Sequence, residues 1–128
     1  MTAAEREVRD GGTIVLAAEC SDGRPDHDSY AEMLGRASTI EGLVALFADP
    51  ALSVPDQWQV QVQARVQSKA RVRVFCGGLS EAQLSAAHLE AAPDVAAAVA
   101  EALGEAGPDA RVCVLPEGPQ TIPYVAGS

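Results

Sequence analysis

The chain has 128 residues, of which 48% are hydrophobic and 21% charged, and its formal net charge at pH 7 is -9. This length suits one ordinary domain, and the apolar content is high enough to offset the entropy cost of folding, which excludes a disordered chain. The negative charge, with no Lys/Arg cluster larger than Arg71 with Arg73, argues against a nucleic-acid partner because phosphate binding needs a positive field.

Membrane insertion and secretion also lack their sequence signals. The longest unbroken apolar stretch, 95–100, is far shorter than the roughly 20 residues that a membrane-spanning helix needs. No basic start followed by an apolar run opens the chain, so we expect no membrane partner and a cytoplasmic location. The three cysteines, Cys20, Cys76 and Cys113, show no CxxC or Cys/His metal spacing. We expect them to be reduced and to act as small buried hydrophobic residues.

Three strands are predicted along the chain. Residues 1–10 are polar and indicate a short lead-in. A continuous apolar, β-branched run then ends in an Asp-Gly turn, which predicts a strand buried on both faces over 12–19. Two further strands are predicted over 71–76 and 110–115, where alternation with Arg indicates at least one partly exposed face.

Helical spacing and capping signals predict helices between these strands. They cover 28–37, then 40–47 after a Ser38 or Thr39 cap, then 80–87 with a Ser80 and Gln83 capping box, and finally a helix with Pro93 in its first turn and a stop at Gly104 or Gly107. Strands interleaved with helices predict a single layered α/β domain with a mainly parallel sheet flanked by helices.

The segment before the second strand fits two patterns. Apolar and polar residues alternate from Val60 to Val66, which favours a strand, whereas Trp58, Val62 and Val66 recur every four residues, which favours a helix. A single strand running through both segments would far exceed the usual length, so we predict a helix to about Gln67. Trp58 is interpreted as a core anchor rather than a stacking platform.

Ligands of parallel α/β sheets lie beyond the carboxyl ends of the strands, which draws attention to the loops 19–27, 76–80 and 116–122. The first loop contains the densest group of ionisable side chains, namely Glu19, Asp22, Asp26, His27 and Asp28. Such side chains can supply a general acid/base or a hard-metal site. The favoured interpretation is a solvated loop with an Asp-Gly turn and a helix cap. His88 is interpreted as a packing or surface residue.

Several catalytic signatures are missing from the sequence. It contains no GxGxxG between a strand and a helix, no GxxxxGK[ST], no GxSxG and no HExxH. Nucleotide cradling, serine hydrolysis and zinc hydrolysis therefore lack their local signals. The residues alone indicate an α/β domain with a polar loop at one sheet edge.

Longer segments resemble a known family. The run 11–23, Gly-Gly-Thr-Ile-Val-Leu-Ala-Ala-Glu-Cys-Ser-Asp-Gly, resembles the opening of the C-terminal domain in the nickel-dependent lactate racemase family. Further matching segments follow in the family's order: Asp56-Gln57-Trp58-Gln59, Lys69-Ala70, His88, 109–118 and Thr121-Ile122-Pro123. The resemblance implies a domain over 11–123, after the lead-in 1–10 and before a tail at 124–128.

The resemblance implies part of a two-domain racemase or epimerase. Its members invert a 2-hydroxy acid by hydride transfer to a nickel-pincer nucleotide. The lysine that tethers the cofactor, the nickel ligand and the acid/base histidines belong to the family's N-terminal domain. We therefore carry no catalytic, cofactor-binding or metal-binding residue over to this chain, and we expect it to be inactive alone. Its expected partners are the N-terminal catalytic domain and, through it, a small 2-hydroxy acid.

The loop after the first strand supplies the residues expected to face the interdomain cleft: Glu19, Cys20, Asp22 and His27. In this loop 24–27 replaces the family's Gly-His pair, so the role of His27 does not transfer. Glu19 and Asp22 are expected to accept backbone N–H hydrogen bonds and to fix the strand-to-helix turn. Their charges would repel an anionic substrate, so no contact with its carboxylate is expected. The alternative is an independent small ligand-binding or protein-interaction module that reuses the fold.

Overall fold

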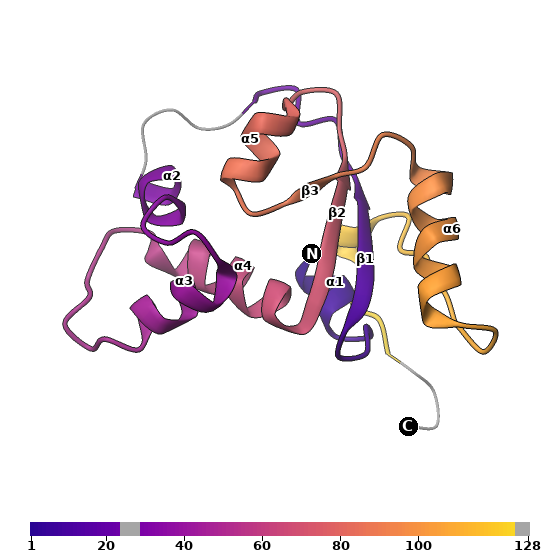
Figure 1. Ribbon diagram of the computed structural model, residues 1–128, viewed down its shortest axis with the longest axis horizontal. Helices are drawn as coiled ribbons and strands as arrows, with labels where there is room; N and C mark the ends of the chain where they lie inside the picture. The colour runs from indigo at the N-terminus through magenta and orange to yellow at the C-terminus, as the bar shows by residue number, and fades with distance from the viewer. Residues whose placement is uncertain (24–28, 125–128) are drawn as a thin grey trace.

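The computed structural model describes residues 1–23 and 29–124. Its elements, in chain order, are α1 (Thr2–Glu5), β1 (Gly12–Ala17), α2 (Ser29–Leu34), α3 (Ile40–Phe47), α4 (Gln57–Lys69), β2 (Ala70–Phe75), α5 (Glu81–Ala86), β3 (Glu90–Ala91), α6 (Val95–Ala106) and the 3-10 helix η1 (Gly118–Gln120). Figure 1 shows α6 on one side of the strands and α4 with α5 on the other. The predicted layered α/β domain is confirmed.

The sheet is parallel and has the strand order β1-β2-β3. β1 and β2 pair along their whole length, from Gly12 opposite Ala70 to Ala17 opposite Phe75. The third strand differs from the prediction: the two-residue β3 pairs with β2, with Glu90 opposite Arg73. Because all strands run the same way, their carboxyl ends meet at one edge of the sheet.

Two strand predictions need correction. The strand predicted over 12–19 forms, but only Ile14 of β1 is buried, so β1 is not buried on both faces. The strand predicted over 110–115 is wrong, since this segment has no strand pairing in the described residues and Val112 and Val114 are exposed. Alternation shows that residues suit a pleated surface, and it does not guarantee a partner strand.

The helix predictions rest on local signals, and most are confirmed. Thr39 caps α3, its hydroxyl accepting a hydrogen bond from the Gly42 amide at 3.1 Å. Ser80 and Gln83 form the predicted capping box of α5. α4 is helical as predicted. In α6, however, Asp94 is the cap, so Pro93 lies outside the helix.

Two clusters of buried side chains form the core. The first packs α4, α5 and the strands together (Ile14, Val66, Ala70, Val72, Val74 and Leu84), and Met1, Ala4 and Val8 of the first ten residues cover it. The second joins α2, α3 and α4 (Met33, Leu34, Leu43, Val60, Ala64 and Ala87). α4 contributes to both clusters. Trp58, at its start, is 60% exposed, so its interpretation as a core anchor is wrong.

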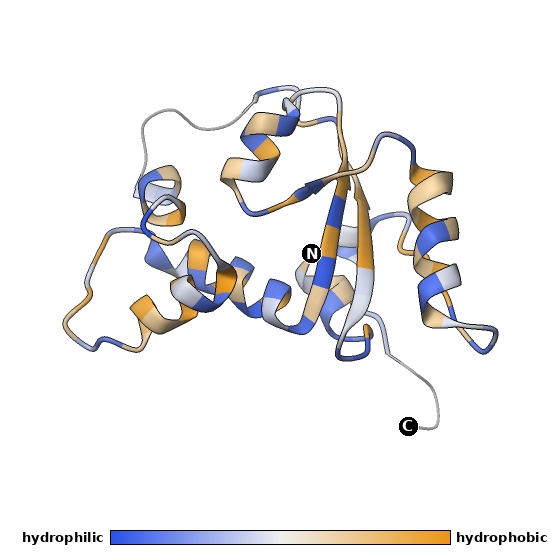
Figure 2. Cartoon of the chain, in the orientation of Figure 1, coloured by the Kyte–Doolittle hydropathy of each residue, from blue (hydrophilic) through white to orange (hydrophobic). Residues whose placement is uncertain are grey.

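Ion pairs attach α6 to the sheet. Hydrophilic and hydrophobic residues alternate along β2 in Figure 2, and its two arginines pair with glutamates of α6. Arg71 contacts Glu90 at 2.7 Å and Glu105 at 3.2 Å, and Arg73 pairs with Glu101. The partly exposed face predicted for this strand is confirmed, because Arg71 and Phe75 are exposed on the face where Arg73 is buried. No helix among the described residues is long and apolar enough to cross a membrane.

Candidate functional site

The loops that follow β1 and β2 meet at the carboxyl edge of the sheet. The Ala18 amide donates to the Phe75 carbonyl at 3.0 Å and extends the strand pairing by one residue. The Gly78 amide donates to the Glu19 carbonyl at 2.9 Å, which joins the two loops directly. Two of the three loops predicted to share this edge are thus brought together.

Gly78 allows this junction because it has no side chain. A Cβ atom built on Gly78 would lie 1.8 Å from the Cys20 carbonyl oxygen and 2.8 Å from that of Glu19. Cys20 has a positive φ of 50°, and its carbonyl accepts from the Gly23 amide at 2.9 Å to close a turn. Close backbone approach, rather than side-chain chemistry, sets the shape of this edge.

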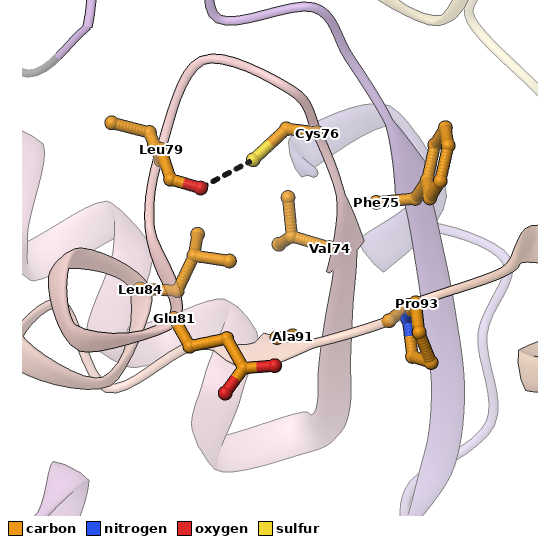
Figure 3. Close-up of a pocket in the computed structure, with 9 residues that line it drawn as sticks. Val74, Phe75, Cys76, Leu79, Glu81, Leu84, Ala91 and Pro93 are labelled. Carbon is orange, nitrogen blue, oxygen red and sulfur yellow. Dashed lines mark hydrogen bonds between the residues drawn. The ribbon is translucent and has the colours of Figure 1, made fainter.

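Two hollows border the joined loops. The larger, about 330 Å³, is open and mainly apolar and is lined by Ala17, Ala18, Glu19, Phe75 and Gly77. Phe75 is 42% exposed there, on the α6 side of the sheet. The smaller, about 150 Å³, lies between β2, β3 and α5 and includes Cys76 and Glu81 (Figure 3). The edge therefore offers apolar surface with few charges.

The carboxylates of the first loop do not play the role expected of them. Glu19 and Asp22 are exposed, and neither carboxylate accepts a hydrogen bond in the described part of the chain. The prediction that they fix the turn is wrong, because the backbone carbonyls of Glu19 and Cys20 accept those bonds instead. Asp26, His27 and Asp28 lie outside the described residues, so the helix cap expected from them lies there too.

The third predicted loop, 116–122, does not join the other two loops at this edge. Its predicted position depends on a strand over 110–115, and that strand does not form. η1, within the loop, packs instead against α1. α1 is attached to the end of α4, where the Lys69 ammonium donates to the Glu5 carbonyl at 2.7 Å and Arg65 pairs with Glu5.

A buried polar network away from this edge was missed by sequence reasoning. Gln63 is 2% exposed, and its amide donates to the Ala87 carbonyl at 2.6 Å and to Gln67 at 2.9 Å. Tyr30 donates to the Gln63 side-chain oxygen. The His88 ring contacts the Leu34 carbonyl at 2.9 Å, which confirms a packing role for this residue. A Gln on a helix gives no sequence signal of burial, since most are exposed.

The three cysteines are free. Cys20 and Cys76 are half-buried, but Cys113 is exposed, because the strand expected to bury it is absent. Burial raises the pKa of the Cys20 thiol, and the neighbouring Cys76 raises it further. No group of three or more His, Cys, Asp or Glu residues within 1–23 and 29–124 is placed to hold a metal ion.

Comparisons with known proteins agree on one family. Residues 1–122 match the model of the lactate racemase C-terminal domain. The chain is 32% identical over 120 residues to a lactate racemase of Lactiplantibacillus plantarum, covering 92% of this chain and 28% of that protein. It is 28% identical over 125 residues to a lactate racemase of Thermoanaerobacterium thermosaccharolyticum, covering 95% of this chain and 29% of that protein.

A solved structure supports the same relationship. The lactate racemase apoprotein from Thermoanaerobacterium thermosaccharolyticum superposes with a TM-score of 0.68 at 26% identity, over 80% of this chain and 25% of that one. The chain thus spans less than a third of the length of these relatives. It belongs to the lactate racemase C-terminal domain family.

Proposed function

We propose that the chain serves as the C-terminal domain of a lactate-racemase-like 2-hydroxy acid racemase or epimerase. One observation supports this most directly. The family match covers nearly the whole chain, and the chain itself covers only 28% of the first relative. A domain that accounts for so small a part of an enzyme is expected to complete a site whose other residues belong to the rest of that enzyme.

The proposed role of this domain is to close one side of the cleft. The loops after β1 and β2 are joined by backbone hydrogen bonds, and the hollow lined by Ala17 and Phe75 provides apolar surface that can exclude water from an interdomain boundary. We keep Glu19, Cys20, Asp22 and His27 as the proposed cleft-facing residues. Glu19 and Asp22 would face the boundary without contacting the substrate carboxylate, because like charges repel.

The cofactor of the proposed enzyme, a nickel-pincer nucleotide, would supply the hydride acceptor. The described residues of this chain do not fit it as a binding site, since they place no group of three or more metal-ligating side chains together. We therefore propose that the N-terminal catalytic domain binds the cofactor, that this chain is inactive alone, and that the assembled enzyme is cytoplasmic.

A domain exchange tests the proposal. The C-terminal domain of the Lactiplantibacillus plantarum relative is replaced by this chain, and interconversion of the two lactate enantiomers is measured by chiral chromatography. We expect turnover by the chimera and none by the chain alone or by the relative without a C-terminal domain. Enantiomers of other small 2-hydroxy acids are assayed in parallel, because the substrate of the parent enzyme can differ.

The exchange also addresses the alternative of an independent binding module. A folded chimera that binds the cofactor but does not turn over any 2-hydroxy acid, while an authentic family domain restores activity in the same position, would contradict the proposal. Circular dichroism and nickel content of each chimera separate this result from a failure to fold or to load the cofactor.

A further inference from the structure

Cys20 and Cys76 lie on the two loops that meet at the carboxyl edge. Ala17 pairs with Phe75 in the strand register, so Cys76 follows opposite Ala18 and Cys20 comes two residues later. The hydrogen bond between the Gly78 amide and the Glu19 carbonyl, 2.9 Å, holds the loops in contact beside both cysteines. A Cβ atom built on Gly78 would lie 1.8 Å from the Cys20 carbonyl oxygen, so the Cys20 backbone packs directly against the loop that follows Cys76.

Cys76 is also reachable from outside. It lines the hollow of about 150 Å³ between β2, β3 and α5. Figure 3 shows its sulfur directed toward Leu79, whose carbonyl accepts the thiol hydrogen bond at 3.9 Å. A small oxidant such as hydrogen peroxide fits into this hollow. It can therefore reach the Cys76 side chain without separation of the two loops.

We propose that Cys20 and Cys76 are a redox modification site, at which a hydroperoxide drives formation of a reversible disulfide between the loops after β1 and β2. Cys76 is the sulfur that meets the oxidant, and Cys20 is the resolving thiol. This chemistry requires two thiols on neighbouring segments, of which one is accessible to the oxidant and can ionise to a thiolate.

The reaction balances with hydrogen peroxide as the oxidant. The Cys76 sulfur attacks one peroxide oxygen, the O–O bond breaks, and Cys76 becomes a sulfenic acid while one molecule of water is released. The Cys20 sulfur then attacks the Cys76 sulfur, the S–S bond forms, and the S–O bond breaks. The hydroxide that leaves Cys76 combines with the thiol proton of Cys20 to form a second molecule of water. A dithiol reverses the oxidation by thiol–disulfide exchange.

The second step depends on pH, because the thiolate of Cys20 is the attacking form. Burial and the adjacent Cys76 raise the pKa of the Cys20 thiol, so disulfide formation should become faster as the pH rises above neutral. The disulfide would close a loop that includes α2, α3 and α4 and would fix the two loops of the candidate site relative to each other. Restricting the unfolded chain in this way should raise the thermal midpoint by about 5–10 °C.

The test uses the chain with Cys113→Ser, which removes the exposed third thiol. Treatment with a small excess of hydrogen peroxide should reduce the free-thiol count to none and lower the mass of the monomer by about 2 Da, for the two hydrogens lost. Dithiothreitol should restore both values, and the thermal midpoint should be higher in the oxidised form.

Further variants identify the sulfur that reacts. Cys20→Ser with Cys113→Ser should retain a Cys76 sulfenic acid that a dimedone probe traps, whereas Cys76→Ser with Cys113→Ser should react much more slowly. Retention of both thiols in the Cys113→Ser chain, oxidation beyond sulfenic acid without a disulfide, or only intermolecular dimers would overturn the proposal. The Cys113→Ser result decides by itself if a second substitution prevents folding.

Discussion

Gly78 determines how closely the two loops of the candidate site approach. Its amide donates a hydrogen bond to the Glu19 carbonyl. A Cβ atom on residue 78 would overlap the Cys20 carbonyl group, which belongs to the backbone and cannot rotate away as a side chain could. The neighbouring Gly77 has nothing within 4 Å of its own Cβ position. A methyl side chain would therefore clash with the backbone at residue 78 but would have free space at residue 77.

Substituting each glycine in turn tests this difference. Gly78→Ala should lower the free energy of unfolding by about 2–3 kcal/mol, because the loops must separate to make room. Gly77→Ala is the matched control and should change it by no more than about 1 kcal/mol in either direction. Urea denaturation of both variants measures the effect. Equal stability of the two would show that the loop junction is looser than described.

The carboxylates of the same loop should be nearly neutral for stability. Glu19 and Asp22 are exposed and accept no hydrogen bond within the described residues, so neither stabilises the turn through its side chain. Glu19→Gln and Asp22→Asn should each change the unfolding free energy by less than about 0.5 kcal/mol. A loss above about 1 kcal/mol for either variant would show that its carboxylate supports the turn after all.

At this scale the sequence predicted where the site loops lie but not which atoms connect them. Residue types suggested carboxylates as acceptors, whereas the backbone of Glu19 accepts the bond, and any residue at that position has the same carbonyl. The burial of Trp58 was predicted wrongly, and the burial of Gln63 was not predicted at all. One is exposed and the other buried, because contacts with distant segments, not residue type, decide burial.

At the scale of elements, ion pairs connect α6 and β3 to β2. Arg71 contacts Glu90 of β3 and Glu105 of α6, so one guanidinium links three elements. The hydrogen bond to Arg71, together with its charge, holds the pKa of Glu90 below its usual value even though partial burial opposes this. The same pairing raises the pKa of Arg71.

The Arg71–Glu90 ion pair should make the free energy of unfolding depend on pH. The folded state lowers the pKa of Glu90 below the usual value of 4.5 for a glutamate, so the stabilisation is complete above about pH 4.5 and is lost as the pH falls through the folded pKa. The Glu90 side chain is about half-exposed at 47%, and solvent screening limits the effect to less than about 1 kcal/mol.

Glu90→Gln, compared with the parent chain, measures this contribution. Urea midpoints at pH 7 should be lower for the variant, and the difference should shrink as the pH falls below about 4.5 and the carboxyl group of the parent becomes protonated. Asp22→Asn, which removes an exposed carboxylate without a hydrogen bond, should show no such pH-dependent difference. A Glu90→Gln effect that is as large at pH 3 as at pH 7 would mean that side-chain shape, not charge, stabilises β3.

Local signals explain which elements could be predicted. The helices α3 and α5 follow from caps within a few residues of their starts, and α4 follows from length. Strand pairing depends on segments far apart in the chain. Residues 110–115 have the alternation typical of a strand but pair with no other strand among the described residues. The two-residue β3 pairs with β2 but is too short to show such alternation. The loop 116–122 was misplaced for the same reason.

At the scale of the whole molecule, several large apolar side chains remain uncovered. Trp58, Phe75, Val112, Val114, Ile122 and Tyr124 are all exposed. If the chain is part of a larger enzyme, as proposed, exposed apolar surface is expected where the other domain would contact it. Tryptophan is the residue most enriched at the centres of protein interfaces, which makes Trp58 the first candidate.

The single tryptophan allows this contact to be observed directly. The chain labelled with 5-fluorotryptophan should give one fluorine NMR resonance, from Trp58, with a solvent isotope shift typical of an exposed indole. Adding the N-terminal part of the Thermoanaerobacterium thermosaccharolyticum relative should broaden and move the resonance and reduce its isotope shift, because an interface would exclude water from the indole. An unrelated protein of similar size is the control. Sedimentation that shows complex formation while the resonance stays unmoved and solvent-exposed would place the docking surface on another face of the domain, away from the start of α4.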